Sequence, residues 1–136
     1  MAIMYIEDID VRNLPDWFWD TLREAEGSRI KLNEILMLLP NEKLREHFYF
    51  FQAATEAISE EPHTLFMQRP GHSLSEDARD DIASIVVSQG KSYYLAVLNE
   101  PKSLADMEED LIDLGGIADS IYEERTGESF WDELMG

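Results

Sequence analysis

The sequence predicts an all-α fold, a single compact helical domain of about six or seven helices, and three observations carry that prediction. Apolar residues recur at steps of three and four along most of the 136-residue chain, as they do on the buried face of a helix. Residues that start and end helices separate these stretches at short intervals. The chain is 44% hydrophobic and 10% aromatic, which is enough to build one core despite its charge.

The N-terminal region combines an extended start with a first helix. Residues 1–13 alternate weakly between apolar and polar side chains, so a short strand or an extended arm is expected there. Pro15 suits the first turn of the helix that follows, and the carboxylate of Asp16 complements the positive end of the helix dipole. We expect Gly27 to end this helix.

Two further helices are expected before the middle of the chain. Ser28 can cap the second helix, which we expect to end at Pro40 because the residue before a proline avoids helical geometry. Asn41 can cap the third helix, which should run for about 18 residues. The expected apolar stripes are Ile30, Ile35, Leu36, Leu38 and Leu39 in the second helix, and Leu44, Phe48, Phe51, Thr55 and Ile58 in the third.

A loop and two more helices follow. Two prolines and a glycine interrupt the periodicity over residues 60–73, which predicts the longest loop of the chain. Either Ser73 or Ser75 can start the next helix, and Gly90 should end it with a positive φ. Another helix begins directly afterwards and closes before Pro101.

The last helical region is expected to begin at Ser103 and to end at Gly127. The pair Gly115-Gly116 lies inside it at a cost of about 1 kcal/mol per glycine, which indicates a break, a kink or a close helix approach. The residues after Gly127 can pack on the core or remain mobile. The predicted organisation is therefore an N-terminal arm over 1–13, a helical domain over 14–127 and a C-terminal tail over 128–136.

The chain is strongly acidic, with a net charge of −18 from 29 acidic and 11 basic residues. Such a charge repels nucleic-acid phosphates and anionic membranes, so neither is an expected partner. Twelve acidic residues fall between Glu100 and Glu133, against only Lys102 and Arg125. This negative surface serves either solubility or the docking of a basic protein partner.

Cysteine usage and the N-terminus predict a cytoplasmic protein. The chain has no cysteine, which excludes disulfides and thiolate chemistry. Its first ten residues, MAIMYIEDID, are acidic where a secretory signal is basic, and no apolar run is long enough to span a membrane.

The familiar catalytic and cofactor motifs are missing. The sequence contains no GxGxxG, P-loop, GxSxG or HExxH, which favours a non-catalytic protein without a cofactor. Glu60-x-x-His63 occurs once, whereas a di-iron bundle needs this spacing twice. The acids at positions 106, 108 and 110 lack the glycine and the final glutamate of a calcium loop. No metal site is therefore expected.

Two groups of polar residues are candidates for function. His63, Arg69, His72 and Asp77 lie in or beside the long loop and could line a small-molecule or hydrolytic site if they converge, whereas His47 is interpreted as an ordinary helical histidine. The candidate contacts for a basic partner are Asp106, Glu108, Glu109, Asp110, Asp113 and Trp19.

Trp19 joins these contacts because Trp17, Phe18 and Trp19 are consecutive, and a helix cannot turn all three inward. Asp77, Asp80 and Asp81 share one helical face. They can complement the helix N-terminus as solvated acids, act on an ion or a proton, or contact a basic partner.

Several short motifs recur in the order seen in a known family. They are Phe18-Trp19, Leu39-Pro40, Glu42-x-Leu44, Ser88-Gln89-Gly90, Asn99-Glu100-Pro101-x-Ser103-Leu104-Ala105 and Tyr122-Glu123-Glu124-Arg125-Thr126-Gly127. With these motifs the chain resembles a divergent member of the bacterial domain of unknown function 4240 family. The divergence lies at residues 61–68, where members have a tryptophan-rich segment. Relatives found beside WGR domains and labelled as resembling molybdenum-metabolism regulators imply a regulatory setting.

Three functions follow from these observations. The preferred one is a non-catalytic cytoplasmic module that binds a basic protein partner through its acidic surface, as a regulator, adaptor or immunity-like inhibitor. The first alternative is a small-molecule or hydrolytic site around residues 60–77. The second is a structural dimerisation module, suggested by surplus aromatic residues such as Trp19 and Trp131. The sequence leaves the oligomeric state open.

Overall fold

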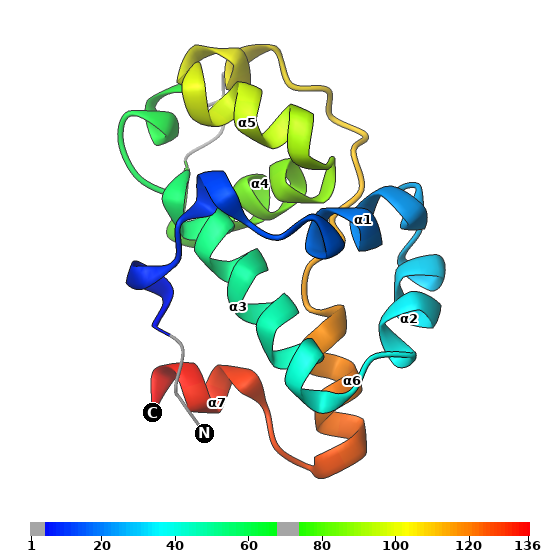
Figure 1. Cartoon of the computed structure of the whole chain (residues 1–136). Helices are drawn as coiled ribbons and strands as arrows, with labels where there is room; N and C mark the ends of the chain where they lie inside the picture. Colours follow the sequence, from blue (N-terminus) through cyan, green and yellow to red (C-terminus); the bar gives the residue numbers. More distant parts are fainter. Residues whose placement is uncertain (1–4, 68–73) are drawn as a thin grey trace.

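The computed structural model describes residues 5–67 and 74–136 and confirms the all-α prediction, with seven α-helices and no strand over these residues (Figure 1). The helices are α1 (Asp16–Ala25), α2 (Arg29–Met37), α3 (Asn41–Ala57), α4 (Glu76–Ser88), α5 (Lys91–Asn99), α6 (Ile117–Thr126) and α7 (Phe130–Met135). Four 3₁₀ turns join them, namely η1 (Ile6–Asp8), η2 (Val11–Asn13), η3 (His63–Phe66) and η4 (Pro101–Asp106).

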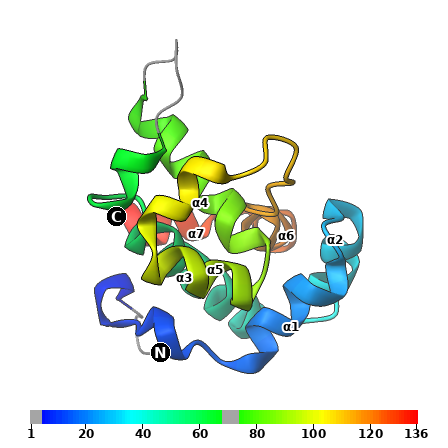
Figure 2. The same ribbon diagram turned by 90° about the horizontal axis from the view of Figure 1, so that it is seen from above.

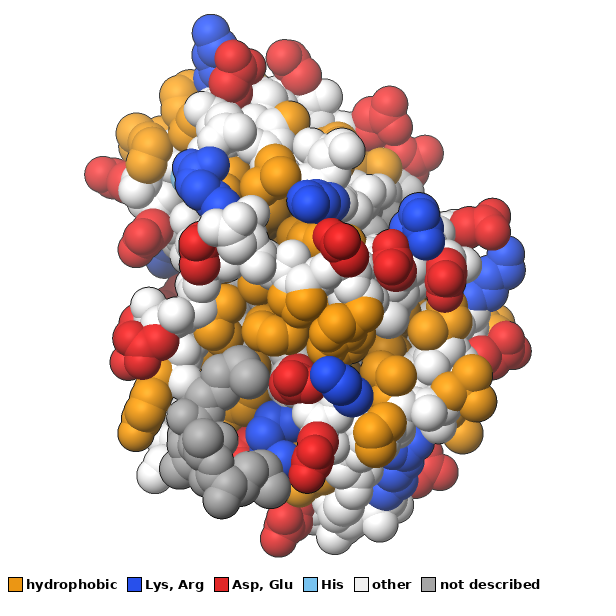
Figure 3. Space-filling model, viewed as in Figure 1, with side chains coloured by type: hydrophobic (Ala, Val, Ile, Leu, Met, Phe, Trp, Pro, Cys, Tyr) orange, Lys and Arg blue, Asp and Glu red, His pale blue; other side chains and the backbone are white. Residues whose placement is uncertain are grey.

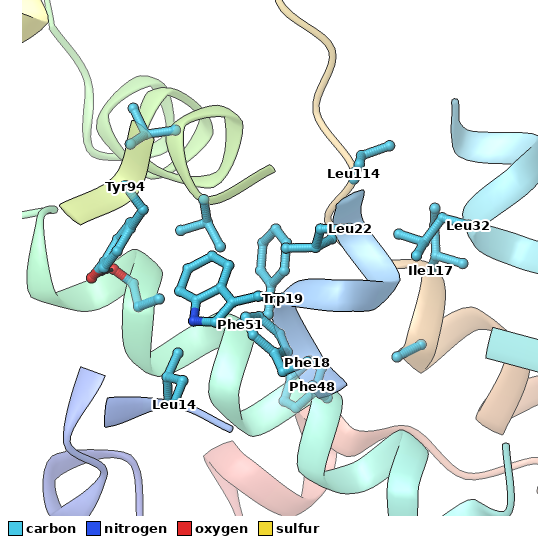
Figure 4. Close-up of a cluster of buried hydrophobic side chains, with 14 of the residues drawn as sticks. Leu14, Phe18, Trp19, Leu22, Leu32, Phe48, Phe51, Tyr94, Leu114 and Ile117 are labelled. Carbon is cyan, nitrogen blue, oxygen red and sulfur yellow. Dashed lines mark hydrogen bonds between the residues drawn. The ribbon is translucent and has the colours of Figure 1, made fainter. Parts of the chain in front are cut away.

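Helix α3 is the centre of the domain. It contacts α4, α6 and both N-terminal 3₁₀ turns, while α1 and α2 lie together on one side of it (Figures 1 and 2). All five apolar-stripe positions predicted for this helix are buried. Figure 4 shows how α1, α3 and α5 meet around one aromatic cluster, which includes Phe18, Trp19, Phe48, Phe51 and Tyr94.

The start of α1 follows the prediction, but the prediction for Trp19 is wrong. The helix begins after Pro15 and ends where Glu26 and Gly27 adopt positive φ values of 51° and 74°. Trp19 is only 5% exposed, and its ring packs against Phe18 and Tyr94 with centroid distances of 5.0 and 5.6 Å. Trp19 is therefore a core residue and not a surface contact for a partner.

Helix α2 buries a narrower stripe than its apolar content suggested. Ser28 caps it as predicted, since its hydroxyl accepts a hydrogen bond from the backbone N–H of Lys31 at 3.2 Å. Leu32 and Leu36 are buried, whereas Ile30 and Leu38 are 74% and 86% exposed. The helix ends at Met37, so Leu38 no longer follows the helical face that the prediction assumed.

The described part of the N-terminal arm contains no strand. Residues 5–13 form η1 and η2, from which Ile6, Ile9 and Val11 pack against the core. Ile6 and Val11 lie on the 3₁₀ turns, whereas Ile9 lies between the turns with an extended backbone, and all three side chains are partly buried. The first four residues lie outside the described ranges.

The long final helix predicted from Ser103 is also wrong in its first half. The Ser103 hydroxyl donates to the Glu100 carbonyl and caps nothing, and the chain has no helix from position 107 to 116. The predicted break at the glycine pair is confirmed, because Gly116 has a φ of 87° and α6 begins directly after it. Helix α6 then ends at Gly127, as expected.

The C-terminal residues pack against the core through α7. The buried carboxylate of Asp119 accepts hydrogen bonds from the Phe130 backbone N–H at 2.6 Å and from the Ser129 hydroxyl. The rings of Phe130 and Tyr122 stack at 4.0 Å, and Arg45 forms an ion pair with Glu133 at 3.1 Å. These contacts hold α7 against α3 and α6.

The surface has two broad properties. Acidic side chains are scattered over the whole face shown in Figure 3, around an apolar centre. None of the described helices combines the length and the apolar content that a membrane span requires.

Candidate functional site

A cleft of about 190 Å³ that combines apolar and charged residues is bounded by α3, α4, the start of α6 and the segment that leads into α6. We call it the acidic cleft. Its lining residues are Leu36, His47, Phe48, Phe51, Gln52, Thr55, Asp80, Asp81, Ser84, Asp113, Leu114, Gly115, Gly116, Ile117, Ala118 and Trp131. A cleft of this kind, apolar inside with a few polar groups, is the usual form of a binding site.

The floor of the cleft is apolar because it is the edge of the main core. Phe48 and Phe51 come from the buried face of α3, and Leu114 and Ile117 come from the two sides of the glycine pair. Trp131 of α7 packs edge-on against Phe48 at 5.0 Å and stands at the boundary of the cleft, 41% exposed. An occupant would therefore meet aromatic and aliphatic carbon at depth.

One wall of the cleft is a segment without helix that α4 holds in place. The Ser84 hydroxyl donates to Asp113 Oδ1 at 2.6 Å, and the same oxygen accepts from the Gly115 backbone N–H at 2.8 Å. The Leu114 N–H donates to the Ser88 hydroxyl at 2.8 Å. These bonds fix the backbone of the wall and the orientation of the Asp113 carboxylate.

Gly115 is required by the close approach of this wall to its neighbours. A Cβ atom at this position would lie 2.6 Å from Ser84 Oγ, 3.1 Å from Asp113 Oδ1 and 3.3 Å from Phe51 Cε1. Arg29 supports the wall from the other side, since its Nη1 donates to the carbonyls of Asp113 and Gly115 at 2.6 and 3.1 Å. Gly115 thus has a packing function at the cleft, whereas a Cβ atom at Gly116 would meet nothing within 4 Å.

The charged rim of the cleft is entirely negative. Asp80 and Asp81 are exposed residues of α4, and Asp113, on the segment that leads into α6, is bonded to Ser84 of the same helix. The lining contains no lysine or arginine, and none of the three carboxylates forms an ion pair within the described ranges. Burial together with the nearby charge of Asp80 raises the pKa of Glu56, which lies beside the cleft on α3. The charged side chains that line the cleft are therefore all negative, and the guanidinium of Arg29 is bonded to the backbone carbonyl of Asp113.

His47 is a buried polar residue of the cleft, as is Thr55, and its imidazole is neutral. It is 2% exposed, and burial lowers its pKa to about 3. The Thr21 hydroxyl lies 2.8 Å from His47 Nε2 and donates to the Phe18 carbonyl, which assigns the imidazole proton to Nε2. A base this weak is poorly suited to take a proton at neutral pH.

The sequence could have shown that His47 is buried. It stands three residues after Leu44 and four before Phe51, on the stripe that packs into the core. The prediction that His47 is an ordinary histidine within a helix is right about the helix. It gave neither the nearly complete burial of the side chain nor its position in the cleft.

The structure separates the acidic residues that were predicted to contact a partner. Asp113 lines the cleft, half-buried, together with Asp80 and Asp81. The other four, Asp106, Glu108, Glu109 and Asp110, are exposed on η4 and the segment after it and line no part of the cleft.

Of the residues predicted for a loop pocket, His63 and Asp77 are described by the structure, and neither lines the cleft. His63 is buried, and its Nε2 donates to the Val97 carbonyl at 3.0 Å, which is a structural bond between η3 and α5. Asp77 is exposed in the first turn of α4. Arg69 and His72 lie outside the described residues. Over the described ranges, no group of three or more histidine or acidic side chains is placed to hold a metal ion.

A family model described as "Protein of unknown function (DUF4240)" matches residues 17–134, which extend from α1 to α7. The chain belongs to this family. No curated protein and no solved structure matches the chain.

The motifs that carried the resemblance have structural roles here. Ser88 and Gln89 hold the cleft wall, since Gln89 Nε2 donates to the Ile112 carbonyl at 3.3 Å. Arg125 donates to the carbonyls of Met37 and Leu39 at 2.7 and 2.8 Å and so joins α6 to the α2–α3 connection.

Proposed function

We propose that this DUF4240 protein is a non-catalytic helical module that binds a basic protein partner, and that the acidic cleft receives one basic side chain of that partner. The supporting observation is the cleft rim, where Asp80, Asp81 and Asp113 face an apolar hollow without a cation among the described residues. Carboxylates left unpaired at the mouth of an apolar cleft gain most from a ligand that brings both positive charge and an aliphatic stem.

The size of the cleft favours a side chain over a cofactor. A cavity of about 150 Å³ holds one benzene molecule, whereas sites for drug-sized ligands measure about 300–1,000 Å³. At about 190 Å³, the cleft accommodates a group slightly larger than benzene. A nucleotide or a flavin would not fit, and one long side chain would.

The surface around the cleft supports an encounter with a basic protein. The net charge of −18 attracts a basic partner from beyond contact distance, and the exposed acids from Asp106 to Asp110 add to that attraction. Long-range attraction mainly raises the association rate, while paired charges in a desolvated cleft control dissociation. The surface thus steers the partner and the cleft retains it.

We further propose that the protein is located in the cytoplasm and has a regulatory role. The absence of cysteine agrees with a reducing compartment. The resemblance to relatives that accompany WGR domains agrees with regulation through protein contacts.

Affinity capture with matched charge variants tests the proposal. The bait is the full chain as wild type, as Asp80→Asn/Asp81→Asn, or as Glu108→Gln/Glu109→Gln, which removes the same charge outside the cleft. We expect the wild type and the second variant to retain a basic protein at low salt that about 0.5 M salt releases, and the first variant to lose it. Equal recovery by all three baits would contradict the assignment to the cleft.

A further inference from the structure

We propose that the described part of the N-terminal arm, residues 5–13, is a strap whose closure over α3 is opposed by the negative charge of the groove beneath it. The strap closes when that charge is screened or removed and loosens when it is not. Three features carry this proposal: the few contacts that hold the arm, the groove between the arm and the rest of the domain, and the acidic residues that line it. The strap requires no partner and does not depend on the proposed function.

Few contacts join the arm to the rest of the domain. Within the described residues, every backbone hydrogen bond of residues 5–13 stays inside the arm. One side-chain hydrogen bond reaches another element, from Arg12 Nη1 to Asn99 Oδ1 at 2.5 Å, at the exposed end of α5. Ile6, Ile9 and Val11 add apolar contacts, and each of them is only partly buried. A segment held in this way can open locally without unfolding the domain.

A groove of about 600 Å³ lies between the arm and the body of the domain. Figure 1 shows the arm alongside α3, with which both of its 3₁₀ turns are in contact. The described residues that line the groove are Ile6, Glu7, Ile9 and Val11 of the arm, Ala53, Glu56, Ala57, Ser59 and Glu60 of α3 and the residues after it, and Glu76, Arg79 and Asp80 of α4. Because of this groove, the arm buries less apolar surface than a segment packed directly against α3.

The groove brings acidic residues of the arm and of the body together. Glu7 belongs to the arm, Glu56 to α3 and Asp80 to α4, and all three are exposed. None of them forms an ion pair within the described ranges. Burial raises the pKa of Glu56, and the charges of Asp80, Glu7 and Glu60 raise it further. These like charges disfavour the approach of the arm to α3.

The arginine of the groove does not neutralise these carboxylates by direct pairing. Arg79 is the one basic residue among the described residues that line the groove, against five acidic ones. It forms no ion pair with any described residue, and its buried Nε has no hydrogen-bond partner among them. The repulsion between the arm and the body therefore persists in the closed position.

Asp80 connects the groove to the acidic cleft, because it lines both. Among the neighbouring charges that raise the pKa of Glu56, that of Asp80 has the largest effect. Removing the charge of Asp80, or placing a positive charge beside it, would therefore favour the closed arm. The strap thus responds to the charge of a residue that is not part of the arm.

Methyl-resolved NMR of the full chain at neutral pH tests the strap. The δ1 methyl groups of isoleucine are labelled with ¹³C, and a neutral paramagnetic probe in the solvent reports how accessible each of them is. Ile6 and Ile9 are the two reporters, and the fully buried Ile58 is the reference. Between about 0.05 and 0.5 M salt, we expect the relaxation enhancement at the reporters to fall about two- to fivefold, with no change at the reference.

Charge variants with a matched control show where the effect arises. At low salt, Glu7→Gln and Asp80→Asn should each lower the enhancement at the two reporters by about twofold, because each removes one of the repelling charges. Glu42→Gln removes an exposed acid at the start of α3, outside the groove, and should leave the enhancement unchanged. Asn99→Ala should raise it, because the arm loses its hydrogen bond to α5.

The proposal is overturned if salt leaves both reporters unchanged, or if Glu42→Gln has the same effect as Asp80→Asn. A parallel change at Ile58 would show that salt acts on the whole domain, which also contradicts a local strap. Unchanged reporters in Asn99→Ala would show that α5 does not hold the arm, with the same consequence. No partner is present in these measurements, so their results are independent of the capture experiment.

Discussion

Replacing Gly115 with alanine should destabilise the protein through one identifiable contact. The new Cβ would stand 2.6 Å from Ser84 Oγ, a separation that real Cβ contacts essentially never show. Either the Ser84 hydroxyl or the wall must move, and both changes break the 2.6 Å hydrogen bond to Asp113. The φ of Gly115 is not in the left-handed region, so the cost comes from packing and not from backbone strain.

The expected size of the effect follows from two contributions. Overpacking a well-filled site costs about 1–3 kcal/mol, and the loss of a hydrogen bond to a charged group costs about 1.5–3 kcal/mol. Because the two share one cause and Ser84 is partly exposed, we expect a total near 2–3 kcal/mol rather than their sum. Such a loss is a large fraction of the stability of a domain of this size.

A double-mutant cycle in urea, followed by circular dichroism, measures this contact. Ser84→Ala alone should cost about 1.5 kcal/mol, the low end of that range, because one hydrogen bond to Asp113 is lost at a partly exposed site. Combined with Gly115→Ala, it should recover at least about 1 kcal/mol, since the clashing oxygen is gone. An additive cycle, or a Gly115→Ala variant within about 0.5 kcal/mol of wild type, would refute this account of the wall.

Three further predictions concern stability. His47 becomes protonated near pH 6.5 in the unfolded chain but only near pH 3 in the folded protein. The free energy of unfolding should therefore fall by up to about 1.4 kcal/mol per pH unit below pH 6.5. In urea unfolding of His47→Asn, this contribution to the pH dependence should be missing. Arg125→Ala should lower the free energy of urea unfolding by roughly 1–3 kcal/mol. Arg125→Lys should lower it somewhat less, because lysine keeps the charge but cannot bond to several acceptors at once as the guanidinium does. Equal stability of the wild type and both variants would contradict the role of this residue. Asp80→Asn/Asp81→Asn should leave the unfolding free energy unchanged or raise it by about 0.5 kcal/mol, since it removes unpaired like charges, and a marked loss would show that these carboxylates have structural partners.

The helices that could be predicted are those whose local signals agree. α3 has the long regular stripe that was predicted, although Asn41 is its first residue and does not cap it, and α4 has the Ser75 hydroxyl bonded to the Ala78 N–H. Gly90 ended its helix with a φ of 103°, as a C-terminal glycine should. In these stretches the local preference and the tertiary packing favour the same structure.

The predictions failed where the local sequence is compatible with more than one structure and tertiary contacts select one of them. Ser103 looks like a cap, but its hydroxyl bonds to the preceding turn, and the 107–116 segment binds to α4 instead of forming a helix. Three consecutive residues of a helix cannot all face the core, but this rule does not say which of Trp17, Phe18 and Trp19 is exposed. The choice of Trp19 was therefore wrong. Half-buried Trp17 is the one that lies nearer the solvent.

The acidic cleft could be predicted only in part. The shared face of Asp80 and Asp81 is visible in the sequence, as is the unusual glycine pair. Their meeting with Asp113 depends on hydrogen bonds between residues 26 to 29 positions apart, which no local pattern encodes. The sequence therefore predicts the acidic residues but not their position around one cleft.

The most direct test of the central claim is the dissociation constant of the captured partner for three forms of the full chain. These are the wild type, Asp80→Asn/Asp81→Asn and Glu108→Gln/Glu109→Gln, compared at one salt concentration by calorimetry. Binding through the acidic cleft predicts at least about tenfold weaker binding for the first pair and no more than about threefold for the second. Equal weakening by both pairs would show that the partner responds to diffuse surface charge, and would contradict the assignment of function to the cleft.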